Sequence, residues 1–204
     1  MAKSIKPDKD ISTEEKIREA AQKIFTQKGY AATRTRDIAE EAGINLALLN
    51  YYFRSKEKLF EQIMLERVQQ LFGVLYPIVN DTNTKLEKKI ELIVINYIDM
   101  LMANPDLPIF VLSEVRNNPD HFKDKIGIEK ILKNTHLIVQ LKEKRPDIHP
   151  YHFIINVLGM TVFAFLSKPI FQSAGLISEH DFNKLAEERK ILIPKWVNAM
   201  LKTK

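Results

Sequence analysis

The chain has 204 residues, of which 45% are hydrophobic and 28% charged, a balance typical of a globular protein and too apolar for a disordered one. It contains no cysteine, which excludes disulfides, thiolate metal sites and thiol-based redox sensing. The formal net charge is +5, of which +3 falls in residues 1–60. This N-terminal excess of cations favours a nucleic acid as partner.

The first residues are polar. Residues 1–11 carry three lysines and two aspartates without periodicity, and we expect a mobile arm that either touches DNA or stays a solvated tail. No apolar signal segment is present, so we expect the protein to stay in the cytoplasm. Ser12 and Glu15 fit a capping box, and apolar residues then recur at helical spacing up to Phe25. This pattern predicts a first helix that ends before Gly29.

The stretch Thr33–Phe60 predicts two short helices joined by a tight turn. Thr35 is the expected N-cap of a helix over 36–42, and Gly43 is expected to end it, since glycine adopts the left-handed conformation without a Cβ clash. Asn45 is expected to cap the next helix. A turn of about three residues that includes a glycine is typical of a helix-turn-helix motif, whose second helix lies in the major groove of DNA.

The second short helix, Leu46–Phe53, has two faces. Leu49 and Phe53 lie four residues apart and are expected to point inward. The candidate base readers on the other face are Leu46, Ala47, Asn50 and Tyr51. Helix N-termini at Thr35, Asn45 and Ser55 provide free N–H groups for phosphates. The cations near them are Arg34, Arg36, Arg54, Lys56 and Lys58.

The segments TRDIAEEAGI, LLNYYF and RSKEKLF resemble the DNA-binding domain of TetR-family transcriptional repressors, and the resemblance covers about residues 12–72. It implies phosphate contacts from Thr35, Asn45, Tyr51, Tyr52 and Lys56, and base contacts from Leu46, Ala47 and Asn50. Thr33 and Arg36 complete the predicted DNA-binding set. We expect an arm over 1–11, a DNA-binding domain over 12–60 with its motif at 34–53, and an effector-binding and dimerisation domain over 61–204.

Two positions depart from the family pattern. Leu46 stands where many members carry lysine or arginine, and Asn50 stands where tyrosine is usual, so the operator sequence cannot be taken from a relative. Our main hypothesis is a ligand-responsive repressor that a small apolar effector releases from a palindromic operator of double-stranded DNA. Leu46 keeps a second hypothesis open: a structural or protein-interaction protein whose helix-turn-helix no longer binds DNA.

The remaining pattern is helical, with no strand pair, and predicts an all-α fold. Ser55 is expected to cap a helix of about twenty residues that stops at Pro77 and joins the DNA-binding head to the rest. Further helices are predicted over 86–104, 108–116, 128–145, 150–167 and 178–201. Pro194 predicts a kink or break near Lys190.

The helix over 150–167 is apolar on nearly every side, so we expect it to have neighbours all round. Its apolar segment 153–166 is shorter than the roughly 20 residues needed to span a bilayer, and we expect no membrane association. We predict a homodimer through this helix and the last one. The predicted interface residues are Phe163, Phe165, Trp196 and Met200.

Outside the helix-turn-helix, the sequence offers few motifs typical of catalytic, cofactor or metal sites. There is no Gly-rich phosphate loop, G-x-S-x-G, H-E-x-x-H or cysteine nucleophile, so we expect neither an enzyme nor a cofactor. His149 and His152 can meet on one helical turn, but such pairs are more often surface or core residues, and we predict no metal site. An effector pocket is expected within residues 86–170, although ordinary core packing is the alternative for each residue. The predicted ligand contacts are Tyr97, Phe110, Asn134, His136, Asn156 and Phe163.

Overall fold

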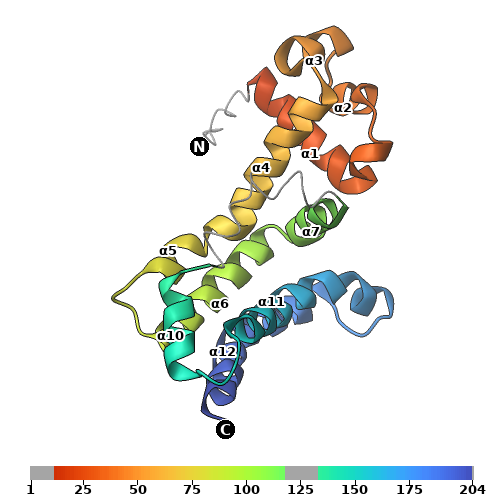
Figure 1. The fold of residues 1–204 in the computed structure, drawn as a ribbon. Helices are drawn as coiled ribbons and strands as arrows, with labels where there is room; N and C mark the ends of the chain where they lie inside the picture. The colour runs from red at the N-terminus through yellow and green to blue at the C-terminus, as the bar shows by residue number, and fades with distance from the viewer. Residues whose placement is uncertain (1–11, 118–132, 204) are drawn as a thin grey trace, which may run out of the picture. The chain divides into compact units, whose positions relative to one another are not determined.

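The computed structural model describes residues 12–117 and 133–203, and within them every regular element is a helix (Figure 1). The all-α fold class is therefore confirmed. The chain divides into two compact units, one up to Glu66 and one from Arg67. The predicted arm over 1–11, and residues 128–132 of one predicted helix, lie outside the described residues.

The first unit contains α1 (Thr13–Ala32), α2 (Thr35–Glu41), α3 (Leu46–Phe53) and the first part of α4 (Lys56–Gly73). Ser12 caps α1 as predicted, because its side chain accepts a hydrogen bond from the backbone N–H of Glu15 at 3.2 Å. The helical path is interrupted at Gly29, whose φ of 73° is left-handed. The predicted end of the first helical segment at this glycine is confirmed, and one more short turn leads on to Ala32.

The caps of the helix-turn-helix follow the sequence at all but one position. Gly43 has a φ of 65°, and the side-chain oxygen of Asn45 accepts a hydrogen bond from the N–H of Leu48 at 2.8 Å. Thr35 is the first residue of α2 and not its N-cap, which corrects our prediction. The N-cap is Arg34, and the carboxylate of Asp37, at the third helical position, accepts a hydrogen bond from the backbone N–H of Arg34 at 3.3 Å, as in a capping box.

The core of the first unit is the predicted one. Ile38 and Leu49 are fully buried, and Phe25 and Phe53 are nearly so. The ring of Phe25 meets the ring of Phe60 edge to face, with 4.9 Å between centroids. This packing leaves the opposite side of α3 free of the core.

The second unit contains the end of α4, α5 (Tyr76–Asn80), α6 (Leu86–Ala103), α7 (Leu107–Asn117), α10 (His136–Lys144), α11 (Pro150–Ser173) and α12 (Glu179–Lys202). The helix α6 packs against α12, α11, α10 and α5, and α11 also contacts α7. The predicted stop at Pro77 is wrong, because α4 ends at Gly73 and Pro77 lies in the first turn of α5, where proline is tolerated.

Two further helix predictions need correction. The helix predicted over 128–145 begins at His136 in the described residues, since Asn134 has a φ of 56° and Thr135 caps α10. Pro194 was predicted to kink or break the last helix near Lys190; no break occurs there, and α12 continues through Pro194. Its neighbours Ile193 and Val197 are fully buried, so packing along the helix outweighs the hydrogen bond that the proline removes.

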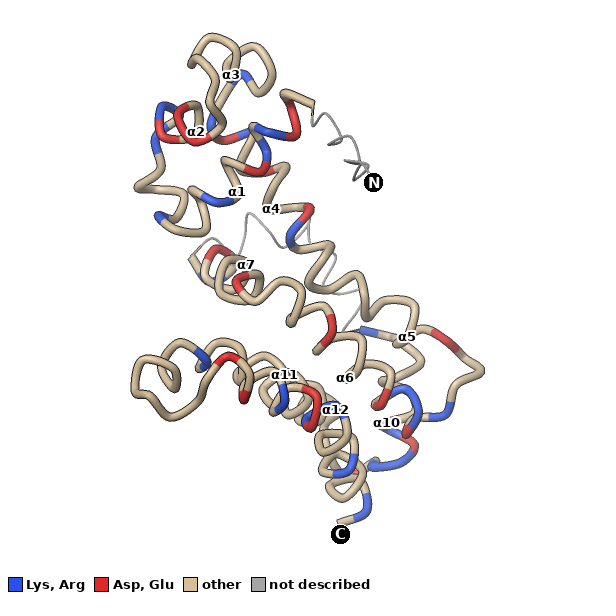
Figure 2. The backbone as a smooth tube through the Cα atoms, turned by 180° about the vertical axis from the view of Figure 1, so that it is seen from behind, with Lys and Arg blue, Asp and Glu red and all other residues tan. Residues whose placement is uncertain are grey.

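The helix α11 is longer and more exposed than predicted. It runs through Pro169 to Ser173, has no acidic residue, and carries Lys168 as its one lysine or arginine (Figure 2). By length and composition alone it could cross a bilayer, so the argument from a short apolar segment is wrong. Ile155, Phe163 and Ile170 are 64%, 66% and 68% exposed, so within residues 12–117 and 133–203 neighbours do not surround α11.

Candidate functional site

The outer face of α3 presents the side chains that the sequence assigned to base reading. Leu46, Ala47 and Asn50 are exposed, and Tyr51 is 79% exposed. The rings of Tyr51 and Tyr52 meet edge to face, with centroids 5.4 Å apart. Because Leu49 and Phe53 anchor the opposite side, α3 is a supported helix with a solvent-facing edge of amide, phenol and small apolar groups, the side chains that contact bases and phosphates.

Cations lie near this face, in different environments. Arg34, Arg36 and Arg54 are exposed, and Arg54 ends α3 with a left-handed φ of 55°. The side-chain N–H groups of Lys28 hydrogen bond to Asp37, and the backbone N–H of Arg34 adds to this, so the pKa of the Asp37 carboxyl lies below its usual value. Asp37 therefore stays ionised and cancels part of the positive charge beside α2.

Besides Asn45, which caps α3, two residues of the predicted DNA-binding set make side-chain hydrogen bonds within the unit. Thr33 is only 2% exposed, and its hydroxyl donates to the carbonyl oxygen of Gly29 at 2.7 Å, so its side chain is not presented on the surface. The ammonium group of Lys56 donates to the carbonyl oxygens of Tyr30 and Thr33 at 3.0 and 2.9 Å. The prediction for the Thr33 side chain is corrected, because its hydroxyl has an internal partner.

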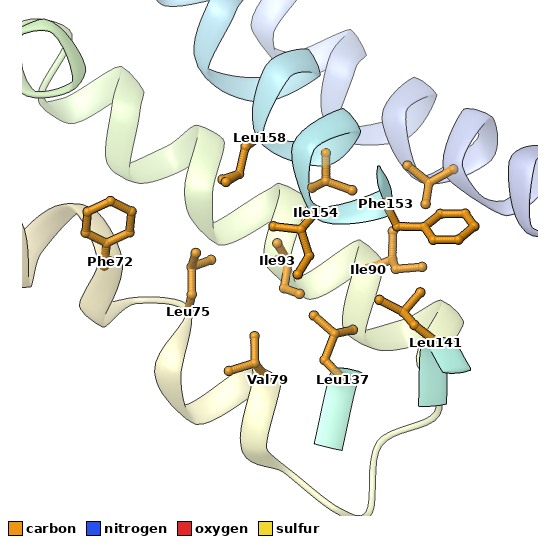
Figure 3. A pocket seen from close by; sticks show the side chains of 12 residues that line it. Phe72, Leu75, Val79, Ile90, Ile93, Leu137, Leu141, Phe153, Ile154 and Leu158 are labelled. Atoms are coloured by element: carbon orange, nitrogen blue, oxygen red, sulfur yellow. The ribbon is translucent and has the colours of Figure 1, made fainter. Parts of the chain in front are cut away.

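The second unit holds an apolar cavity of about 80 Å³. Its wall is built by side chains from α4, α5, α6, α10, α11 and α12 that converge on one space (Figure 3). Every lining residue is apolar, with no hydroxyl, amide or charge: Phe72, Leu75, Val79, Ile90, Ile93, Leu137, Leu141, Phe153, Ile154, Val157, Leu158 and Val197. Such a wall can hold a hydrocarbon group but offers it no hydrogen bond.

The six predicted ligand contacts do not line this cavity. Tyr97 and Phe110 are buried at 2% and 5% exposure, and burial raises the pKa of the Tyr97 phenol, which stays neutral. Asn134 is exposed in a left-handed turn and not at a helical position. Asn156 and Phe163 are exposed on α11. His136 is half-buried and lies 2.7 Å from the ammonium nitrogen of Lys89.

The sequence predicted a pocket within residues 86–170, and most of the lining residues fall in that range, but the individual lining residues were missed because they carry no distinguishing signal. Ile90 and Ile93 on α6, and Leu137 and Leu141 on α10, occupy the helical spacing that predicts ordinary core. A cavity arises from how several helices meet, which periodicity along one helix does not report.

The predicted interface residues differ in accessibility. Phe163 and Trp196 are 66% and 42% exposed, and the guanidinium of Arg189 lies over the Trp196 ring at 5.7 Å. Phe165 is only 5% exposed, because its ring packs against Phe182 with centroids 5.3 Å apart. Phe165 belongs to the core of its own chain, and its assignment to an interface is corrected.

Comparison with known proteins agrees with the helix-turn-helix. Residues 17–63 match the profile described as bacterial regulatory proteins, tetR family. Over 203 residues the chain is 24% identical to the HTH-type transcriptional regulator YttP of Bacillus subtilis (strain 168), covering 95% of this chain and 96% of that protein. The chain belongs to the TetR family of transcriptional regulators. This confirms the resemblance in the sequence, and the relatives are named as transcriptional regulators.

Other relatives of this TetR-family regulator cover less of it or share only its fold. The HTH-type transcriptional repressor KstR2 of Mycolicibacterium smegmatis is 31% identical over 124 residues, which cover 54% of this chain and 60% of that protein. The crystal structure of FadR from Bacillus subtilis in complex with stearoyl-CoA is similar with a TM-score of 0.59 and 17% identity, covering 87% of this chain and 95% of that one. TetR-family regulators bind operator DNA, act as dimers and bind small-molecule ligands.

Proposed function

We propose that this TetR-family regulator is a cytoplasmic repressor that binds a palindromic operator as a homodimer and is released by a small, largely apolar effector. DNA binding is assigned to residues 12–60, and effector binding and dimerisation to residues 61–204. The observation that carries the proposal is the outer edge of α3, where Asn50 and Tyr51 are exposed above an anchored inner side. A helix presented in this way fits the major groove.

The apolar cavity supports a hydrocarbon effector. A ligand bound there gains affinity from apolar surface alone, because the wall has no polar group to hydrogen bond it. Similarity of fold to FadR, which was solved with stearoyl-CoA, favours an acyl chain as the buried part. We propose that the acyl chain of the effector enters between α6, α10 and α11, where Ile93, Leu137 and Leu158 face the cavity (Figure 3).

The exposed side of α11 and α12 supports the homodimer. Phe163 and Trp196 belong to a group of large apolar side chains exposed on these two helices, together with Ile155, Ile170, Phe171, Ile191 and Leu192. Surfaces of this kind on a soluble regulator mark interaction sites. A palindromic operator needs two recognition helices related by a two-fold axis. Pairing of this surface with the same surface of a second copy supplies that axis.

The experiment that tests DNA binding uses duplexes from the DNA flanking the gene. Asn50→Ala should reduce discrimination between the operator and random DNA by about 1–3 kcal/mol, since one base-edge contact is lost. Asn183→Ala removes an exposed asparagine of α12 and is the matched control, which should bind like the parent. Parent protein that binds operator and random duplexes equally would favour the second hypothesis, a helical protein that no longer reads DNA.

The effector is tested by calorimetry with acyl-CoA thioesters of increasing chain length, with and without operator. Coupling between two sites is reciprocal, so an effector that weakens operator binding tenfold must itself bind tenfold more weakly to the operator complex, about 1.4 kcal/mol. Equal effector affinity in both titrations would show that the cavity does not control DNA binding.

A further inference from the structure

Lys56 opens α4, but its side chain turns back to the segment that connects α1 and α2. Its Nζ atom donates to the carbonyl oxygen of Tyr30 at 3.0 Å and to that of Thr33 at 2.9 Å. The same atom lies 4.2 Å from the centroid of the Tyr30 ring. Two of its three N–H groups and its charge therefore have partners inside the first unit.

The connecting segment is held from its other side as well. Gly29 adopts a φ of 73°, and its carbonyl oxygen accepts a hydrogen bond from the buried hydroxyl of Thr33 at 2.7 Å. The Tyr30 ring packs on Phe60 of α4 with centroids 4.7 Å apart. The residues that lead into α2 are thus fastened to α4 through one aromatic contact and two charge-assisted hydrogen bonds.

We propose that Lys56 is a positioning residue, which joins the start of α4 to the α1–α2 connection and so sets the orientation of α2 and α3 for DNA. The inference rests on the proposed DNA binding and assigns Lys56 a role other than the phosphate contact that family resemblance implies. Two of the three N–H groups of this amine are held by carbonyl oxygens, so at most one is left for a phosphate. Arg36 and Arg54 are exposed, so their guanidinium groups are accessible to phosphates.

The positioning role of Lys56 follows from its distance in sequence from the two carbonyl groups that it binds. Lys56 lies 26 residues after Tyr30 and 23 after Thr33, so its two hydrogen bonds close the whole helix-turn-helix between them. Any change in the position of the first turn of α4 is carried to the segment before α2 through these bonds. The proposed recognition helix, α3, lies within this loop. Its orientation therefore depends on Lys56, although Lys56 does not need to contact it.

The experiment compares Lys56→Met, which removes every donor, with Lys56→Gln, which removes the charge but keeps an NH₂ group to donate to the carbonyls. Operator binding is measured at 15 °C, well below unfolding, as a function of salt. Lys56→Met should weaken operator binding about tenfold with an unchanged salt slope, and Lys56→Gln should recover most of that loss. Lys142→Gln, an exposed lysine of α10, is the control for a general loss of charge.

Two outcomes of the DNA-binding experiment overturn the proposal, and a third comes from a measurement without DNA. A phosphate contact predicts that both Lys56 variants lower the salt slope by about 0.9 for each head, since one counterion fewer is released. A purely structural role predicts a lower Tm with parent affinity at 15 °C. A third measurement is independent of DNA: the backbone amide shifts of residues 29–34 must change in Lys56→Met and return towards the parent in Lys56→Gln. Parent-like shifts in Lys56→Met would overturn the inference even if the parent bound no operator.

Discussion

The ammonium nitrogen of Lys89 lies 2.7 Å from Nδ1 of His136. Lys89 is fully buried on α6, and it also donates to the side-chain oxygen of Gln140 at 3.1 Å. An ammonium group can only donate, so the protonated Lys89 side chain donates to Nδ1 of His136 in this contact. The three side chains tie α6 to α10 directly beside Leu137 and Leu141 of the cavity wall.

The first prediction concerns the pH dependence of stability through Lys89. Burial lowers the pKa of this ammonium group, and the charge of Asp81 offsets only part of the effect. Between the lowered pKa and the ordinary value of 10.5, the unfolded chain binds more protons than the folded one, so this group makes stability rise with pH in that window. Lys89→Met should remove that rise, measured by urea unfolding at several alkaline pH values.

The control for Lys89 is its neighbour Lys88, an exposed residue paired with Glu91 at 2.8 Å. Lys88→Met should keep the pH dependence of the parent. If Lys89→Met and the parent gave parallel curves of stability against pH, the buried ammonium group would not be the source of the alkaline stabilisation.

The second prediction tests the cavity by filling it. Val157→Phe places a ring in a space of about 80 Å³ and should weaken an acyl effector at least tenfold, about 1.4 kcal/mol, by occupying its site. Operator binding without effector should be close to that of the parent, so the variant should stay bound where the parent is released. Val139→Phe, at a position of α10 that is 45% exposed, adds the same ring outside the cavity and should respond normally.

The third prediction concerns the oligomeric state. Phe163→Glu puts a charge on the exposed side of α11 and should convert a dimer to a monomer at micromolar concentration, since burying an unpaired carboxylate is costly. Light scattering gives the mass directly. Ile109→Glu is the matched control, an equally apolar and 54% exposed residue on α7. A monomeric parent would refute the homodimer. A dimeric Phe163→Glu variant would place the interface elsewhere, and Trp196→Glu then tests α12.

The fourth prediction compares a glycine with a left-handed φ, Gly43, with a glycine at a helix end, Gly73. Gly43→Ala should destabilise the protein by about 1–2 kcal/mol, because alanine is strained at a φ of 65° although no atom lies within 4 Å of the added Cβ. Gly73→Ala, at the end of α4 and equally free of contacts, should be neutral or raise stability by up to about 1 kcal/mol. Equal losses in urea unfolding would show that backbone strain at Gly43 is not the cause.

The helix-turn-helix could be predicted from sequence because its signals are local. Gly43, Asn45 and Ser55 act on backbone groups within four residues, and the spacing of Leu49 and Phe53 decides which side of α3 is buried. The cap predicted at Thr35 was wrong, although the residues that decide it are also close in sequence: Arg34 is the N-cap, and the carboxylate of Asp37 accepts a hydrogen bond from the backbone N–H of Arg34. Contacts of the exposed α3 side chains with bases and phosphates stay predictions.

The remaining features were decided by tertiary structure, because they depend on residues far apart in the chain. Lys56 finds its carbonyl partners more than twenty residues away, and the cavity takes its wall from six helices. The apolar pattern of α11 established that this helix avoids water, but Phe163 and Phe165 look alike in sequence. The packing of α12 buries Phe165 against Phe182 and leaves Phe163 exposed. The hydrophobic effect is non-directional: it favours burial of both rings but does not determine which surface covers each one.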